Sequence, residues 1–257
     1  MILSLPLCAA VALPPEWQEL TLRVPAAVGI TTGFALLARG LRGVTNRGAL
    51  AGALVTLLVF LAAGTPGFLA ILMVFVLTTA ATQVGYSRKV QLGTAELRTG
   101  RNARQVFANL LVSALVVTPA IFFPESRRFL FVGACASLAE AAADTVSSEL
   151  GQVLGKNAYL VTNLQPVPVG QNGGISVVGT FSGMVAAFLM AFSCWWLHLV
   201  SPTGFVIVLI SAVLGMFFDS LLGATIERPG RLGNNSVNFL STTFAASIGL
   251  IGTLLFE

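Results

Sequence analysis

The chain has 257 residues, of which 56% are hydrophobic and only 9% are charged. Soluble domains carry about a quarter charged residues, so this composition excludes a soluble globular protein and indicates one covered by lipid. The sequence pI of about 9.4 does not indicate a nucleic-acid partner, because no dense basic run interleaved with aromatic residues occurs.

The first apolar stretch, 3–13, is too short to cross a bilayer comfortably. No convincing cleavage site follows it, so we expect it to stay in the mature chain as a signal-like segment or an interfacial helix. Runs of about 20 apolar residues, the length that crosses a bilayer, then predict spans at 24–39, 48–64, 67–84, 105–123, 129–150, 177–199, 204–223 and 237–256. We therefore predict one all-α transmembrane domain, residues 1–257, built as a polytopic bundle of about eight spans, with seven as the alternative.

Basic residues are concentrated in the loops that follow the first, third, fifth and seventh predicted spans. Those loops hold 11 of the 14 lysines and arginines, and the opposite side holds only Arg23, Arg127 and Arg128. By the positive-inside rule the basic loops are cytoplasmic, which places both termini outside. The basic loops are also long and rich in glycine, so we expect the binding function at the cytoplasmic face.

Cysteine and histidine predict no metal or redox chemistry. Cys8, Cys135 and Cys194 lie in apolar stretches without a CxxC partner, and a single histidine cannot build a zinc site. We interpret the cysteines as small buried side chains. His198 follows two tryptophans, which is typical of an anchor at the membrane interface.

The chain has only two aspartates, Asp144 and Asp219, and both lie inside predicted spans near the cytoplasmic end. A charged residue at the centre of a span costs about 2.5–3.5 kcal/mol on insertion scales, so each aspartate marks a candidate functional site. Small and polar residues recur every three or four positions around both, which lets helices approach closely. They are Ser137, Glu140 or Ala141, Ser147 or Ser148 and Gly151 around the first aspartate, and Ser211, Gly215 and Gly223 around the second.

Two carboxylates on closely packed helices at one membrane depth predict a Mg²⁺ site. Mg²⁺ takes one or two carboxylates and completes its shell with phosphate oxygens and water. The alternative is that Asp144 and Asp219 each only hydrogen-bond a neighbouring helix.

The loop after Asp144 is rich in glycine. Gly173, Gly174 and Ser176 immediately precede the span at 177, and Lys156 lies earlier in the same loop. Glycines let the backbone approach a phosphate, and a helix N-terminus offers free N–H groups to an anion. The spacing is not that of a Walker A loop. An ordinary flexible loop followed by a Gly179–Gly183 packing motif fits the pattern equally well.

Arginines and amides open two other inner helices. The segment before the span at 105 and the start of that span contribute Arg98, Arg101, Arg104 and Asn109. Arginine matches phosphate geometry in bidentate fashion, although topology alone would also place arginines there. Asn235 and Asn238 open the last span, where they either contact a polar ligand or serve the helix N-terminus.

Six segments of the chain carry distinctive residues in a fixed order. They are 46–53, 100–109, 139–151, 173–180, 219–224 and the pair Asn235 with Asn238. Together they resemble a widespread integral-membrane family that includes the phytyl-phosphate kinases of plastids and cyanobacteria. The spacing from Asp144 to Gly155-Lys156 is more faintly similar to dolichol kinase and phosphatidate cytidylyltransferase. Lys156 and 157–169 fall where the family varies.

The resemblance implies transfer of a phosphoryl group from a nucleoside triphosphate, CTP, to a prenyl monophosphate such as phytyl or geranylgeranyl phosphate, as in tocopherol biosynthesis. It also implies Mg²⁺ held by Asp144 and Asp219. On that basis we expect the catalytic residues to be Asp144, Asp219, Glu149 and Arg101. We expect the substrates to be bound by Arg98, Arg104, Asn109, Lys156, Gly173, Gly174, Ser176, Asn235 and Asn238.

Two other classes use the same polar rim. One is a cytidylyltransferase-like lipid enzyme, which would release pyrophosphate where a kinase releases CDP. The other is a transporter or binding protein for an anionic lipid, for which the outer halves of the spans are too apolar. Membrane lipids are partners in every case. The sequence decides neither the prenyl chain length, nor the nucleotide, nor whether the chain forms a homo-oligomer.

Overall fold

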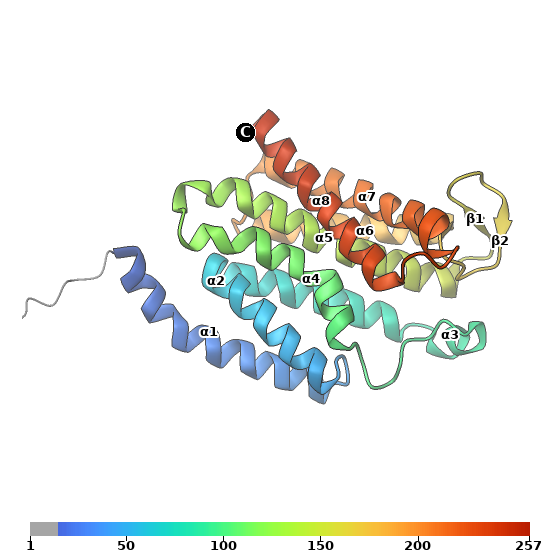
Figure 1. The fold of residues 1–257 in the computed structure, drawn as a ribbon, viewed down its shortest axis with the longest axis horizontal. Coiled ribbons are helices and arrows are strands. Elements are labelled where there is room, and N and C mark those ends of the chain that lie inside the picture. Colours follow the sequence, from blue (N-terminus) through green and yellow to red (C-terminus); the bar gives the residue numbers. More distant parts are fainter. Residues whose placement is uncertain (1–14) are drawn as a thin grey trace, which may run out of the picture.

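The computed structural model describes residues 15–257, so the stretch 3–13 and Cys8 lie outside the described residues. Eight helices form the bundle, as predicted for an all-α protein (Figure 1). They are α1 (Pro15–Gly40), α2 (Asn46–Gln83), α3 (Tyr86–Leu92), α4 (Ala103–Val117), α5 (Arg127–Leu154), α6 (Val177–Trp196), α7 (Pro202–Leu222) and α8 (Asn234–Phe256). Short turns η1 (Thr118–Ile121), η2 (Pro124–Ser126) and η3 (Gly223–Glu227) and strands β1 (Ala158–Leu160), β2 (Pro166–Val167) and β3 (Gly174–Ile175) complete the chain.

Within residues 15–257, seven helices are long and apolar enough to cross a membrane. One of them, α2, has 38 residues and is broken at Gly64, whose φ of 64° and ψ of −156° are not helical. Ala49 and Phe75 pack in one apolar cluster, although a straight helix would separate them by about 39 Å. The two arms of α2 therefore fold back on each other (Figure 1) and account for the predicted spans 48–64 and 67–84.

Side-chain oxygens at the helix starts explain where several spans begin. Thr45, Ser176 and Ser201 each accept a hydrogen bond from a backbone N–H of the first turn of α2, α6 and α7. Asn102 forms a full capping box with Gln105 at the start of α4. Such caps satisfy the free N–H groups of a helix terminus.

Helix α5 lies at the centre of the bundle. It packs against α2, α4, α6, α7 and α8, and 78% of the residues in its apolar membrane-spanning stretch are buried. Small residues permit this, because a Cβ atom at Gly179 would lie 2.8 Å from the Ser147 carbonyl oxygen and one at Gly249 would lie 2.9 Å from Ala136. The Gly179–Gly183 motif thus packs α6 against the polar end of α5.

The four basic loops meet at one end of the bundle. Arg101 N–H donates to the Gly43 carbonyl at 3.0 Å, and Thr45 N–H donates to the Arg101 carbonyl at 2.9 Å. The loop after α5 is an ordered antiparallel sheet of order β2-β1-β3, with Tyr159 paired to Ile175. Gly173 touches Ala224 of η3. At the other end, Arg128 and Ser201 both bind the Glu257 side chain.

Candidate functional site

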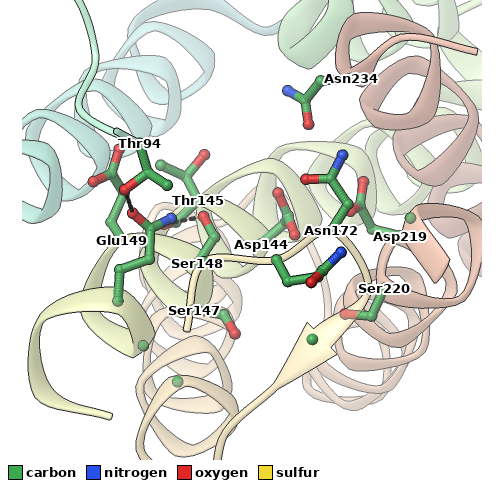
Figure 2. Close-up of a pocket in the computed structure, with 18 of the residues that line it drawn as sticks. Thr94, Asp144, Thr145, Ser147, Ser148, Glu149, Asn172, Asp219, Ser220 and Asn234 are labelled. Carbon is green, nitrogen blue, oxygen red and sulfur yellow. Dashed lines mark hydrogen bonds between the residues drawn. The ribbon is translucent and has the colours of Figure 1, made fainter. Parts of the chain in front are cut away.

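A polar cavity of about 380 Å³ opens at the end of the bundle where the basic loops meet (Figure 2). Its walls come from the inner ends of α4, α5, α7 and α8, from the segment 94–101 and from the sheet loop. Segments more than 100 residues apart in the sequence therefore share one cavity at the membrane surface.

Asp144 of α5 and Asp219 of α7 lie in the middle of this cavity. Both carboxylates line the cavity, and Figure 2 shows them beside Asn172 of the sheet loop. Ser241 of α8 donates a hydrogen bond to Asp219 Oδ2 at 3.0 Å. The structure thus brings together the two carboxylates that the sequence singles out, and a third helix fixes one of them.

Glu140 lies one helical turn below Asp144 and was not selected as a site residue from the sequence. Its side chain is 1% exposed, and neither carboxylate oxygen has a hydrogen-bond partner among residues 15–257. It fits the space that Gly215 leaves on α7, because a Cβ atom there would lie 2.5 Å from Glu140 Cγ. The sequence pattern that could have marked Glu140 is its four-residue spacing from Asp144, which places both carboxyl groups on one helix face.

Glu149 lines the cavity, but its carboxylate is already engaged. Glu149 Oε2 accepts a hydrogen bond from Lys89 Nζ at 2.5 Å, and Oε1 accepts one from Thr82 Oγ1 at 3.1 Å. Lys89 is fully buried and also donates to the carbonyls of Ala81 and Thr82 at 2.9 and 2.7 Å. This geometry favours a positioning role for Glu149, joining α3 and the end of α2 to α5. In the sequence, Lys89 is one of the 11 basic residues that indicate the topology.

Arg101 lies at the cavity wall with its backbone held by the loop after α1. Burial lowers the pKa of its guanidinium, while the carboxylates of Glu96, Glu149 and Asp144 act in the opposite direction. An arginine stays charged in such a setting. Within the described part of the chain, its side chain makes no ion pair or hydrogen bond, so it is available to an anion.

Amide side chains connect the neighbouring helices beside Arg101. Asn238 Nδ2 of α8 donates to Asn109 Oδ1 of α4 at 3.2 Å. Asn109 Nδ2 donates to the Gln105 carbonyl at 2.8 Å, and Gln105 Nε2 donates to Glu96 Oε1 at 2.9 Å. Asn238 therefore does more than open a helix, because it ties α8 to α4 at the cavity.

The other predicted binding residues divide into two groups. Gly173, Gly174, Ser176 and Asn235 line the cavity, and Ser176 Oγ is used to cap α6. Three basic residues do not line it: Arg98, Arg104 and Lys156. The Arg98 guanidinium lies 5.1 Å from the ring centre of Tyr86, on a neighbouring cavity of about 400 Å³. The side chains of Arg104 and Lys156 are exposed, because they stand on the outer side of a helix start and of a loop.

Several cavity residues had little or no signal in the sequence. Asn172 lies within the glycine-rich loop and Ser220 follows Asp219, so both were close to predicted positions. Thr94 and Gln152 were not expected, and Thr94 Oγ1 donates to Gln152 Oε1 at 2.6 Å. This bond holds the segment before α4 against the end of α5.

Within residues 15–257, no group of three or more His, Cys, Asp and Glu side chains is arranged to hold a metal ion alone. The described residues that line the cavity include Asp144 and Asp219, three glutamates (Glu96, Glu149 and Glu227), amides, hydroxyls and Arg101. Two aspartates in such surroundings suit a magnesium ion that arrives with phosphate oxygens. The donor set fits Mg²⁺ bound to a phosphate ester better than a bare structural ion.

Comparison with known proteins agrees with a membrane bundle. A family described as integral membrane protein DUF92 matches residues 29–246. A membrane protein of Synechocystis, named as uncharacterized, is 34% identical over 196 residues, 75% of this chain and 76% of the relative. Protein VTE6 of Arabidopsis thaliana, described as chloroplastic, is 30% identical over 216 residues, 81% of this chain and 65% of VTE6. A Methanocaldococcus jannaschii membrane protein, also named as uncharacterized, is 28% identical over 245 residues, 94% of this chain and 98% of the relative. No solved structure matches significantly.

Proposed function

Because the chain belongs to the DUF92 family of integral membrane proteins, we propose that it is a membrane kinase. It transfers a phosphoryl group from a nucleoside triphosphate, CTP, to a prenyl monophosphate such as phytyl or geranylgeranyl phosphate. The observation that carries the proposal is the pair Asp144 and Asp219, which line one polar cavity at the end of the bundle together with Arg101. The resemblance of six segments to phytyl-phosphate kinases supports the choice of substrates.

Phosphoryl transfer depends on positioning and charge neutralisation more than on covalent chemistry. An oxygen of the acceptor monophosphate attacks the γ-phosphorus of the triphosphate. The bond between that phosphorus and the β–γ bridging oxygen breaks, giving a prenyl diphosphate and a nucleoside diphosphate. The attacking phosphate is already anionic, so no side chain has to remove a proton. This fits the cavity, because none of the described residues that line it is a histidine.

The residues of the cavity divide the remaining tasks. Asp144 and Asp219 hold Mg²⁺, which when bound neutralises charge on the triphosphate. Arg101 pairs with phosphate oxygens of the acceptor, for which its planar guanidinium is well shaped. Glu149 of α5 holds α3 in place through its ion pair with Lys89. Asn238 holds α8 against α4 through its hydrogen bond to Asn109. The basic loops at this end of the bundle support a cytoplasmic position for the cavity, by the positive-inside rule.

A transporter would need a path to the other face of the membrane. Below Glu140, the core around α5 is closed by buried apolar side chains, among them Val132, Leu138 and Val208. This packing favours an enzyme that works from one face.

The test uses the purified full chain in detergent, phytyl or geranylgeranyl monophosphate, Mg²⁺ and each of the four nucleoside triphosphates. We expect prenyl diphosphate with release of the nucleoside diphosphate, and no product when Mg²⁺ is chelated. Release of pyrophosphate with the nucleotide retained on the lipid would identify a cytidylyltransferase-like enzyme instead. Absence of diphosphate product with every donor would refute the kinase.

A further inference from the structure

A narrow apolar groove runs into the bundle between α1, both arms of α2 and α4. Its free volume is about 70 Å³. Its lining includes aromatic and aliphatic side chains, among them Phe34, Val44, Ile71, Val74 and Phe75, together with three threonines. This groove adjoins the polar cavity and lies among the membrane-spanning helices.

The groove and the polar cavity meet at three residues. Arg101, Gln105 and Asn109 line both, and Ala141 of the groove lies one turn before Asp144 on α5. The apolar groove thus ends at Arg101, which also lines the polar cavity. A molecule with an anionic head and a hydrocarbon chain matches this arrangement, because each part meets groups of its own polarity.

Glycines of the first arm of α2 shape the groove. A Cβ atom at Gly48 would collide with the carbonyl oxygen of Arg101, so the glycine allows the helix to touch that loop. At Gly52, one turn further into the membrane, a Cβ atom would have no heavy atom within 4 Å. Gly52 therefore borders open space in the groove. Thr56, one further turn along, is fully buried with its hydroxyl unpaired among the described residues.

Helix α1 forms the outer wall of the groove and is the least enclosed span. It packs mainly against α2, and only 22% of the residues in its apolar membrane-spanning stretch are buried. Its Phe34 ring makes edge-to-face contacts with Phe68 and Phe75 at 5.5 and 5.3 Å. Figure 1 shows α1 at the margin of the bundle. One peripheral helix thus separates the groove from lipid.

We propose that this groove binds the hydrocarbon chain of the acceptor lipid, with the lipid phosphate at Arg101. The inference rests on the proposed function and narrows its substrate to lipids with a single chain. A cavity of roughly 150 Å³ admits benzene, so about half that volume admits only the first few carbons of one chain. The rest of the chain leaves the groove past α1. The two acyl chains and glycerol of a phosphatidate do not fit.

The test blocks the groove at Gly52 with Gly52→Phe and, as a milder change, Gly52→Leu. Gly33→Phe is the matched control, because Gly33 is exposed on α1, lies outside the groove and also has open space around its Cβ position. Binding of radiolabelled phytyl monophosphate is measured beside turnover, with thermal unfolding as a check on folding.

We expect Gly52→Phe to weaken phytyl monophosphate binding by at least about tenfold, with Gly52→Leu intermediate and Gly33→Phe unchanged. The KM for the nucleotide stays the same. Excess phosphatidate does not displace phytyl monophosphate.

The outcomes separate the two proposals. Wild-type turnover with equal lipid binding by Gly52→Phe and Gly33→Phe overturns the groove and leaves the kinase standing. Binding that depends on Gly52, without turnover by any nucleotide, supports the groove and overturns the kinase. Effective competition by phosphatidate overturns the restriction to single chains. A wild type that neither binds nor converts the lipid overturns both.

Discussion

Lys89 offers a sharp test of how the cavity is held together. Its ammonium group has three donors, and all three are used, by Glu149 Oε2 and by the carbonyls of Ala81 and Thr82. The substitution Lys89→Met keeps an unbranched side chain of similar length and removes the charge. It leaves the Glu149 carboxylate buried without its cation and removes the donor that holds the last turn of α2.

Breaking a buried ion pair by removing one partner costs about 3–5 kcal/mol. The full range applies because the Lys89 and Glu149 side chains are only 1% and 10% exposed, so water screens the pair little. For a chain of this size, 1 kcal/mol shifts the unfolding temperature by about 2–4 °C. We therefore expect Lys89→Met to unfold about 10 °C below the wild type.

The double variant Lys89→Met with Glu149→Gln tests whether the lower stability of Lys89→Met comes from the unpaired charge of Glu149. Neutralising both partners removes the uncompensated charge, so the double variant should be more stable than Lys89→Met alone. The control is Lys156→Met, because Lys156 is the other lysine of the chain and is exposed. We expect it to match the wild type.

A thiol-reactive fluorophore can follow the unfolding in detergent. Cys135 and Cys194 are buried and unpaired, so they become reactive only when the bundle opens, and a Cys8→Ser background removes the remaining thiol. The reasoning is refuted if Lys89→Met unfolds at the same temperature as Lys156→Met. It is also refuted if the double variant is no more stable than Lys89→Met alone.

Three further predictions concern the cavity itself. Asp144→Asn and Asp219→Asn should each lower the Mg²⁺-dependent rate by about a hundredfold or more while unfolding as the wild type does, and a wild-type rate in either variant would remove the metal role. Arg101→Lys should raise the KM for the lipid phosphate by about tenfold because a bidentate contact is lost, whereas Arg104→Lys should leave it unchanged; equal effects would show that Arg101 has no special position. Glu140→Gln keeps the side-chain shape and removes a buried carboxyl group that has no hydrogen-bond partner among residues 15–257. The unfolding temperature of this variant should not fall, and a clear decrease would reveal a stabilising contact.

Much of the fold could be predicted because lipid imposes long apolar segments that are visible one at a time. The break in α2 was also visible, since Gly64 and Pro66 interrupt an apolar run. The two aspartates were found for the same reason, because a carboxylate within such a run is rare and expensive.

Pairing between distant segments left no such signal. Lys89 and Glu149 are 60 residues apart, and nothing near Lys89 distinguishes it from a loop charge that sets topology. Arg104 and Lys156 are residue types that commonly bind phosphate. The direction in which their side chains point depends on the conformation of the helix start and of the loop that carry them, which the sequence does not show. The strands of the loop after α5 have two or three residues each, too few for a periodic pattern.

The fold of α2 has a consequence for how the chain enters the membrane. A single non-helical residue, Gly64, joins its two arms, and the tip lies near Arg23 at the end of the bundle opposite the cavity. Because no longer loop separates the arms, we expect the two to insert into the bilayer together as a helical hairpin, with the tip crossing the hydrocarbon layer. Lengthening that turn would uncouple the arms during biosynthesis, while the finished cavity on the opposite face would keep its shape.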